Sequence, residues 1–171
     1  MSEHDTKAAS TRTSRKKAAA AVSGAGMSEY ITVVIEDQLF GIPVPRVHDV
    51  FMPQSMTRVP LSAPEVAGVL NLRGRIVTAI DMRRRLGLQS RDRTAGCMAV
   101  GVEHRGESYG LIIDSVGEVL RVADADMESN PANLDPRWRE ISAGVQRLES
   151  RLMIVIDVER VLNFTGQTLA A

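Results

Sequence analysis

The amino-acid sequence predicts a mainly β fold that consists of two similar small β units with short helices. Three observations support this fold class. Short runs of β-branched and apolar residues, bounded by glycine, proline or aspartate, recur along the chain. The order of these runs repeats once. Each repeat also ends where an aspartate precedes a short helical segment. Short strands at such regular spacing are typical of barrels rather than of a parallel sheet.

The first half of the chain carries the signals of five short strands. They are expected, in order, at residues 30–36, 39–43, 47–51, 66–72 and 75–80. Asp37-Gln38 and Arg73-Gly74 are the expected turns of two hairpins. Three prolines between the third and fourth strands predict a loop, because proline removes a backbone donor and fixes φ.

The second half shows the same succession of strands and turns. Its strands are expected at residues 97–103, 108–114, 118–122, 145–148 and 152–156. The intervening segment 124–139 is polar and contains two prolines, which predicts a long excursion with room for a short helix.

Each half is expected to close with a short capped helix. The carboxylate of Asp81 can accept hydrogen bonds from the first free N–H groups of a helix over 82–86, and Gly87 would end that helix. Asp157 stands in the same relation to a closing helix over 158–162.

Sequence similarity between the halves supports the same organisation. Phe40-Gly41-Ile42 matches Tyr109-Gly110-Leu111, and Ile80-Asp81-Met82 matches Ile156-Asp157-Val158, in the same order. The predicted divisions are a disordered tail over 1–28 and a body over 29–167. Within the body we expect a first subdomain at about 30–90, a second at about 95–155 and a closing helix at about 158–163.

Charge and composition exclude several function classes. The chain has 21 basic and 21 acidic residues, so it lacks the basic excess of a generic nucleic-acid or anionic-membrane binder. Every lysine lies within residues 1–26, a segment with too little apolar surface to offset its ordering entropy. This segment is interpreted as an inert leader. The alternative interpretation is a weak electrostatic tether formed by Arg15-Lys16-Lys17. No apolar run is long enough for a membrane span or a signal-peptide core, so the cytoplasm is the expected location.

No convincing catalytic or metal-binding constellation is found in the sequence. The single cysteine, Cys97, and three scattered histidines argue against a metal site, and no cofactor is predicted. The segment 106–110 satisfies the G-x-S-x-G pattern around Ser108. That pattern needs a strand–turn–helix and, in hydrolases, a later histidine, whereas an apolar strand follows here and no histidine does. A hydrolase that uses Ser108 is therefore a minor alternative, and we expect no enzyme activity.

A longer motif carries a family resemblance. The segment from Gly68 to Arg83 contains Asn71-Leu72-Arg73-Gly74, then an apolar strand and Asp81. It resembles the central signature of the CheW family of chemotaxis coupling proteins. Two further blocks resemble that family as well: Phe40-Gly41-Ile42 with Val47-His48-Asp49-Val50 upstream, and Ile154-Val155-Ile156-Asp157-Val158 at the end. The resemblance covers residues 30–164.

The resemblance implies a fold of two packed five-stranded SH3-like β-barrel subdomains with short helices. It implies a non-catalytic scaffold that couples the cytoplasmic tips of methyl-accepting chemoreceptors to the histidine kinase CheA, through the kinase's own CheW-like regulatory domain. Such an adaptor works at receptor arrays on the inner face of the membrane, without inserting into it. An adaptor of a non-flagellar chemosensory system, such as pilus motility, is the alternative.

The residues that the family links to receptor and kinase contacts correspond here to Val47, Asp49, Gly68, Arg73 and Gly74. A carboxylate could hold Arg73, and Asp49 is a candidate that sequence alone does not establish. Asp49 replaces the family's commoner glutamate, so its reach toward Arg73 would be shorter. Thr78 stands where the signature strand usually has proline.

Overall fold

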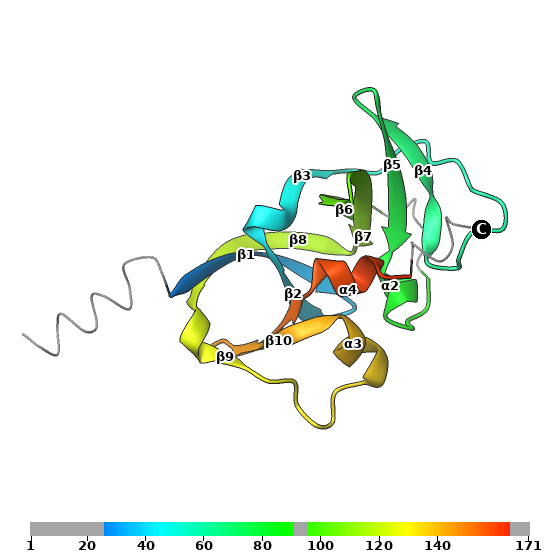
Figure 1. The fold of residues 1–171 in the computed structure, drawn as a ribbon. Helices are drawn as coiled ribbons and strands as arrows, with labels where there is room; N and C mark the ends of the chain where they lie inside the picture. The colour runs from blue at the N-terminus through cyan, green and yellow to red at the C-terminus, as the bar shows by residue number, and fades with distance from the viewer. Residues whose placement is uncertain (1–25, 91–95, 165–171) are drawn as a thin grey trace, which may run out of the picture.

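The computed structural model describes residues 26–90 and 96–164, and its strands form two sheets (Figure 1). The six-stranded sheet has the order β8-β1-β2-β11-β10-β9 and the five-stranded sheet the order β3-β6-β7-β5-β4. The strands of the first sheet are β1 (Met27–Ile35), β2 (Gln38–Pro43), β8 (Ser115–Ala123), β9 (Met127–Glu128), β10 (Ser142–Arg147) and β11 (Leu152–Ile156). Those of the second are β3 (Val47–Phe51), β4 (Val66–Leu72), β5 (Arg75–Asp81), β6 (Met98–His104) and β7 (Glu107–Ile113). The prediction of a mainly β fold is confirmed.

The helices among the described residues are short. They are α2 (Met82–Arg85), α3 (Pro136–Ile141) and α4 (Val158–Leu162), with 3-10 turns η1 (Val44–Arg46) and η3 (Asp124–Asp126). The predicted caps are confirmed: Asp81 accepts from the backbone N–H of Arg83 at 3.0 Å, and Asp157 accepts from that of Arg160 at 3.3 Å. The polar excursion holds η3, β9 and α3.

The two sheets divide the chain differently from the predicted subdomains 30–90 and 95–155. The hairpin β1–β2 of the first half lies between β8 and β11 of the second half. The hairpin β6–β7 of the second half lies in turn between β3 and β5 of the first. The parallel pairs β2–β11 and β5–β7 join the two halves. Each half therefore contributes a hairpin to the sheet of the other half. The two halves repeat the order of strands along the chain, but each sheet contains strands from both halves.

The exchange of hairpins creates one large core between the sheets. Phe40 and Ile156 from the six-stranded sheet and Ile80 and Leu111 from the five-stranded sheet belong to the same cluster, and none is more than 1% exposed. Burial of these side chains from water is the main stabilising contribution of such a core. Trp138 of α3 covers this core from outside, with its ring centroid 5.6 Å from that of Phe40.

Two boundaries differ from the sequence predictions. The first turn falls at Glu36-Asp37, where both residues have positive φ (44° and 65°), rather than at Asp37-Gln38. Residues 27 and 28 belong to β1, where Met27 pairs with Ala123, and not to the predicted tail. Residues 1–25, including the proposed tether, lie outside the described residues.

Candidate functional site

The predicted contact residues fall on opposite edges of the five-stranded sheet. Val47 and Asp49 lie on the edge strand β3, whereas Gly68, Arg73 and Gly74 lie on the β4–β5 hairpin at the other edge. The hairpin tip extends beyond the rest of the sheet in Figure 1.

The turn of the β4–β5 hairpin presents an arginine on a defined backbone. Arg73 and Gly74 have φ of 53° and 83°, the two consecutive positive values that a type I′ hairpin turn requires. The N–H of Gly74 donates to Asn71 Oδ1 at 2.9 Å. Arg73 and Gly74 are exposed, and Ile76 on the same hairpin is 64% exposed. The turn thus displays a cationic and an apolar side chain on a rigid base.

The side chain of Asp49 on β3 lies against the adjacent strand β6. The register shifts between Val47 and Asp49, and the side chain of Asp49 lies over Gly101 of β6, in the space that a Cβ would fill. Within residues 26–90 and 96–164, Asp49 and Arg73 form no ion pair. The carboxylate of Asp49 faces Gly101, and Asp49 lines a small cavity together with Leu72 and Arg75 of the β4–β5 hairpin, next to the turn that carries Arg73. Sequence reasoning missed Gly101, which is distinguished only by its place opposite Asp49.

Gly68 is buried within β4 and is not itself exposed to a partner. A Cβ at this position would come within 2.6 Å of the carbonyl oxygen of Thr57. Thr57 and Val69 exchange backbone hydrogen bonds of 2.8 Å in both directions. Because Gly68 has no side chain, the segment around Thr57 can lie directly beside β4. This contact positions the loop that connects Thr57 to the beginning of β4.

Strand β3 also exposes apolar side chains. Val47 is half-buried against the main core and pairs with Val102, but Val50 and Met52 are 37% and 57% exposed. Val119 of β8 is 52% exposed. Exposed apolar residues are common singly, so it is the pair formed by Val50 of β3 and Met52, one residue past its end, that favours a contact surface close to Asp49.

The surroundings of Ser108 do not form a hydrolase site. Ser108 lies inside β7, paired with Glu103 and Val77, rather than on a strained turn before a helix. It shares a cavity of about 10 Å³ with His48 and Asp49. That volume holds about one water molecule and no ester substrate.

The arginines of the run 83–85 serve three separate contacts. Arg83 pairs with Asp114, Arg84 approaches Asp81, and Arg85 donates to the carbonyl oxygens of Arg160 and Val161. The run therefore does not form a single basic face.

No group of histidine, cysteine, aspartate and glutamate that could hold a metal ion occurs in the described part of the chain. None of its helices is long and apolar enough to span a bilayer.

Comparisons with known proteins give the family. The family model of the CheW-like domain matches residues 29–165. Chemotaxis protein CheW of Helicobacter pylori is 28% identical over 78% of this chain and 81% of its own length. Chemotaxis protein CheW of Bacillus subtilis is 29% identical over 78% of this chain and 85% of its own length.

A solved structure agrees with the sequence relatives. The scaffolding protein TtCheW from Thermoanaerobacter tengcongensis superimposes with a TM-score of 0.73 at 25% identity, over 82% of this chain and 96% of that chain. The resemblance seen in the signature 68–83 is thereby confirmed. The chain belongs to the CheW-like domain family and is a non-catalytic scaffold protein of chemotaxis.

Proposed function

We propose that this chain couples the cytoplasmic tips of chemoreceptors to the histidine kinase CheA, by binding the kinase's own CheW-like regulatory domain. The observation that carries the proposal is the rigid Arg73-Gly74 turn on a chain of this family. A preorganised side chain loses little conformational freedom on binding, which favours its use as a recognition element.

We assign the contacts to two places on the five-stranded sheet. Arg73 and Gly74 form one contact at the hairpin tip, and Val47 and Asp49 form the other on β3, next to the exposed Val50. An apolar strip of this kind suits one face of a helical receptor tip. Gly68 contributes by positioning the loop that precedes β4.

We further propose that residues 29–167 are the binding unit and that the protein works on the cytoplasmic side of the membrane, at receptor arrays. The same surface would serve an adaptor of a pilus-based or other non-flagellar system. Titration against the regulatory domains of the different CheA proteins of one cell distinguishes these pathways.

The test is a calorimetric titration of the regulatory domain of a cognate CheA into the chain, with and without residues 1–26. We expect saturable binding by both forms. Arg73→Glu should weaken binding of the kinase domain or of a receptor tip by about tenfold or more, since a buried charge contact is lost and a repulsive one is introduced.

The chain offers a matched control for this substitution. Arg105-Gly106, the turn of the β6–β7 hairpin, has nearly the same backbone, with φ of 51° and 78°. Arg105→Glu therefore makes the same change of charge, in a turn with the same backbone conformation, at another position. Equal effects of Arg73→Glu and Arg105→Glu, or none from Arg73→Glu on either partner, would contradict the proposed site.

A further inference from the structure

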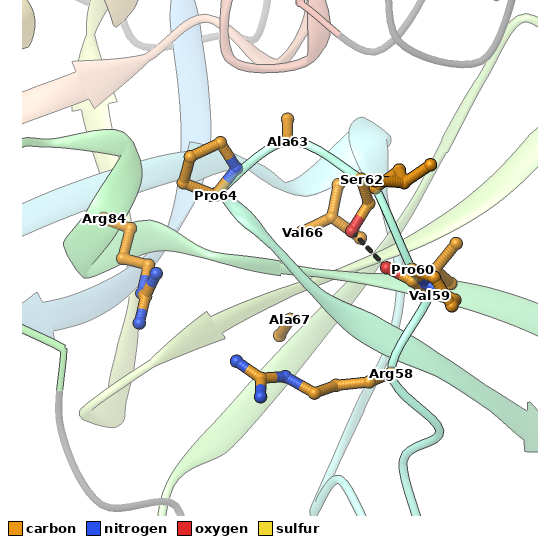
Figure 2. A pocket seen from close by; sticks show the side chains of 10 residues that line it. Arg58, Val59, Pro60, Ser62, Ala63, Pro64, Val66, Ala67 and Arg84 are labelled. Atoms are coloured by element: carbon orange, nitrogen blue, oxygen red, sulfur yellow. Dashed lines mark hydrogen bonds between the residues drawn. The ribbon is translucent and has the colours of Figure 1, made fainter.

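A cavity of about 390 Å³ lies between the loop that precedes β4 and the beginning of α2 (Figure 2). It is lined by Arg58, Val59, Pro60, Leu61, Ser62, Ala63, Pro64, Val66, Ala67 and Arg84. Two arginines and no acidic residue line it. None of the five proposed contact residues lines it, although Gly68 directly follows the lining residue Ala67 in β4.

The positive charge in this cavity is only partly compensated. Figure 2 shows the side chain of Arg58 extending toward Ala67, and that of Arg84 extending from α2 on the other side of the loop. Arg84 Nε is 3.8 Å from Asp81 Oδ2, beyond hydrogen-bonding distance, and the same oxygen accepts from the hydroxyl of Ser90 at 2.9 Å. Arg58 is exposed and forms no ion pair with any residue of 26–90 or 96–164. Two like charges that face one space favour an anionic ligand there.

The loop beside the arginines displays apolar side chains at a conformational cost. Leu61 is fully exposed, and its φ of 61° lies in the left-handed region that leucine rarely adopts. Val59 is 36% exposed. The hydroxyl of Ser62 donates to the carbonyl oxygen of Val59 at 2.8 Å and holds the loop in this shape. Because the Leu61 side chain is fully exposed, no contact with the described residues 26–90 and 96–164 offsets this strain, which points to a partner that covers it.

We propose that this cavity binds an acidic peptide segment of a partner protein. Its carboxylates pair with Arg58 and Arg84, since the planar guanidinium binds a carboxylate through two parallel hydrogen bonds. An apolar side chain next to those carboxylates covers Leu61 and Val59. The charge of the cavity selects an acidic segment over a basic one, and the exposed leucine selects a peptide over a free anion.

The test measures fluorescence anisotropy with the full chain and a short labelled peptide in which glutamates flank a leucine. The matched peptide has glutamine in place of each glutamate. We expect the acidic peptide to bind more tightly, and Arg58→Gln with Arg84→Gln to weaken binding by about tenfold or more. Arg105→Gln, the same change of charge on the distant β6–β7 turn, should leave it unchanged.

A second variant tests the apolar part of the site. Leu61→Asn removes the apolar side chain but keeps a residue that tolerates positive φ, so folding should be unaffected while binding falls by about tenfold. Equal affinity for the two peptides, or a loss with Arg105→Gln as large as with the double variant, would overturn the proposal. So would displacement of the peptide by inorganic phosphate together with unchanged binding by Leu61→Asn, since that result describes a simple anion site. Because no kinase or receptor enters the measurement, its failure is distinct from failure of the proposed function.

Discussion

Arg83 and Asp114 form a bidentate ion pair, with Nε 2.9 Å from Oδ1 and Nη2 2.6 Å from Oδ2. Asp114 also accepts from the backbone N–H of Glu36 at 2.8 Å, and the Glu36 carboxylate lies 3.9 Å from Arg83. The hydrogen bond to Asp114 raises the pKa of Arg83 above its ordinary value, so the guanidinium stays charged wherever the protein is folded. This cluster joins α2, the corner between β7 and β8, and the β1–β2 turn, which belong to different sheets.

Loss of this ion pair should destabilise the whole fold. Arg83→Gln removes the bidentate charged contact to the carboxylate of Asp114, which is 14% exposed. We expect the free energy of unfolding in urea to fall by about 2 kcal/mol, less than for a fully buried pair because both side chains still touch water. Arg84→Gln, on the same helix but 41% exposed, is the control and should cost about 0.5 kcal/mol or less. Equal losses in the two variants would show that the pair contributes nothing beyond a surface charge.

The two helix caps should differ in strength. Asp81 is 5% exposed and accepts from two backbone N–H groups and from Ser90, whereas Asp157 accepts from the N–H of Arg160 and is more exposed. We expect Asp81→Ala to lower the free energy of unfolding by about 2 kcal/mol and Asp157→Ala by about 1 kcal/mol. Denaturant titration measures both. Asp157→Asn, which keeps a capping oxygen, should remain within a few tenths of a kcal/mol of the unaltered chain, and a reversed order of the two alanine variants would contradict this account.

A methyl group at Gly68 should displace the loop before β4. Its Cβ would meet the carbonyl oxygen of Thr57, which is backbone and cannot rotate away. We expect Gly68→Ala to cost about 2–3 kcal/mol in chemical denaturation and to weaken binding of the acidic peptide, since Leu61 lies on the displaced loop. Gly74→Ala is the comparison, because no atom lies within 4 Å of a Cβ there and only the positive φ is strained. Its cost should be about 1 kcal/mol, with peptide binding unchanged; loss of peptide binding in both variants would argue against a local effect.

Gly101 and Asp49 should behave as a coupled pair. Gly101→Ala would place a methyl group where the Asp49 side chain lies, so it should both destabilise the fold and move the carboxylate. Asp49→Ala frees that space. We expect the double variant to recover about 1 kcal/mol relative to the sum of the single changes, measured as a double-mutant cycle in urea. Strict additivity would mean that the two residues do not share the space.

The sequence was informative wherever structure depends on neighbours along the chain. β4 and β11 occupy the predicted ranges 66–72 and 152–156, and α4 occupies 158–162, because alternation and an aspartate cap are local signals. The turn at Glu36-Asp37 was misplaced by one residue, since positive φ was adopted without a glycine to mark it. The exchange of hairpins was not predictable from local pattern: the parallel pair of β2 with β11 joins residues such as Phe40 and Ile154, which are remote in sequence. For the same reason the position of Gly101 opposite the Asp49 side chain was not visible in the local pattern.

The connections that pass between the sheets are very short. One 3-10 turn separates β2 from β3, and one residue, Asp114, separates β7 from β8. A chain that crosses twice in this way cannot hinge between its two sheets without breaking strand pairs, unlike two domains joined by a linker. The molecule therefore has the properties of a spacer of fixed length. On the proposed function, a partner at the Arg73-Gly74 turn and a partner at β3 would be kept at one distance and one mutual angle, and a shift in one of them would be passed to the other.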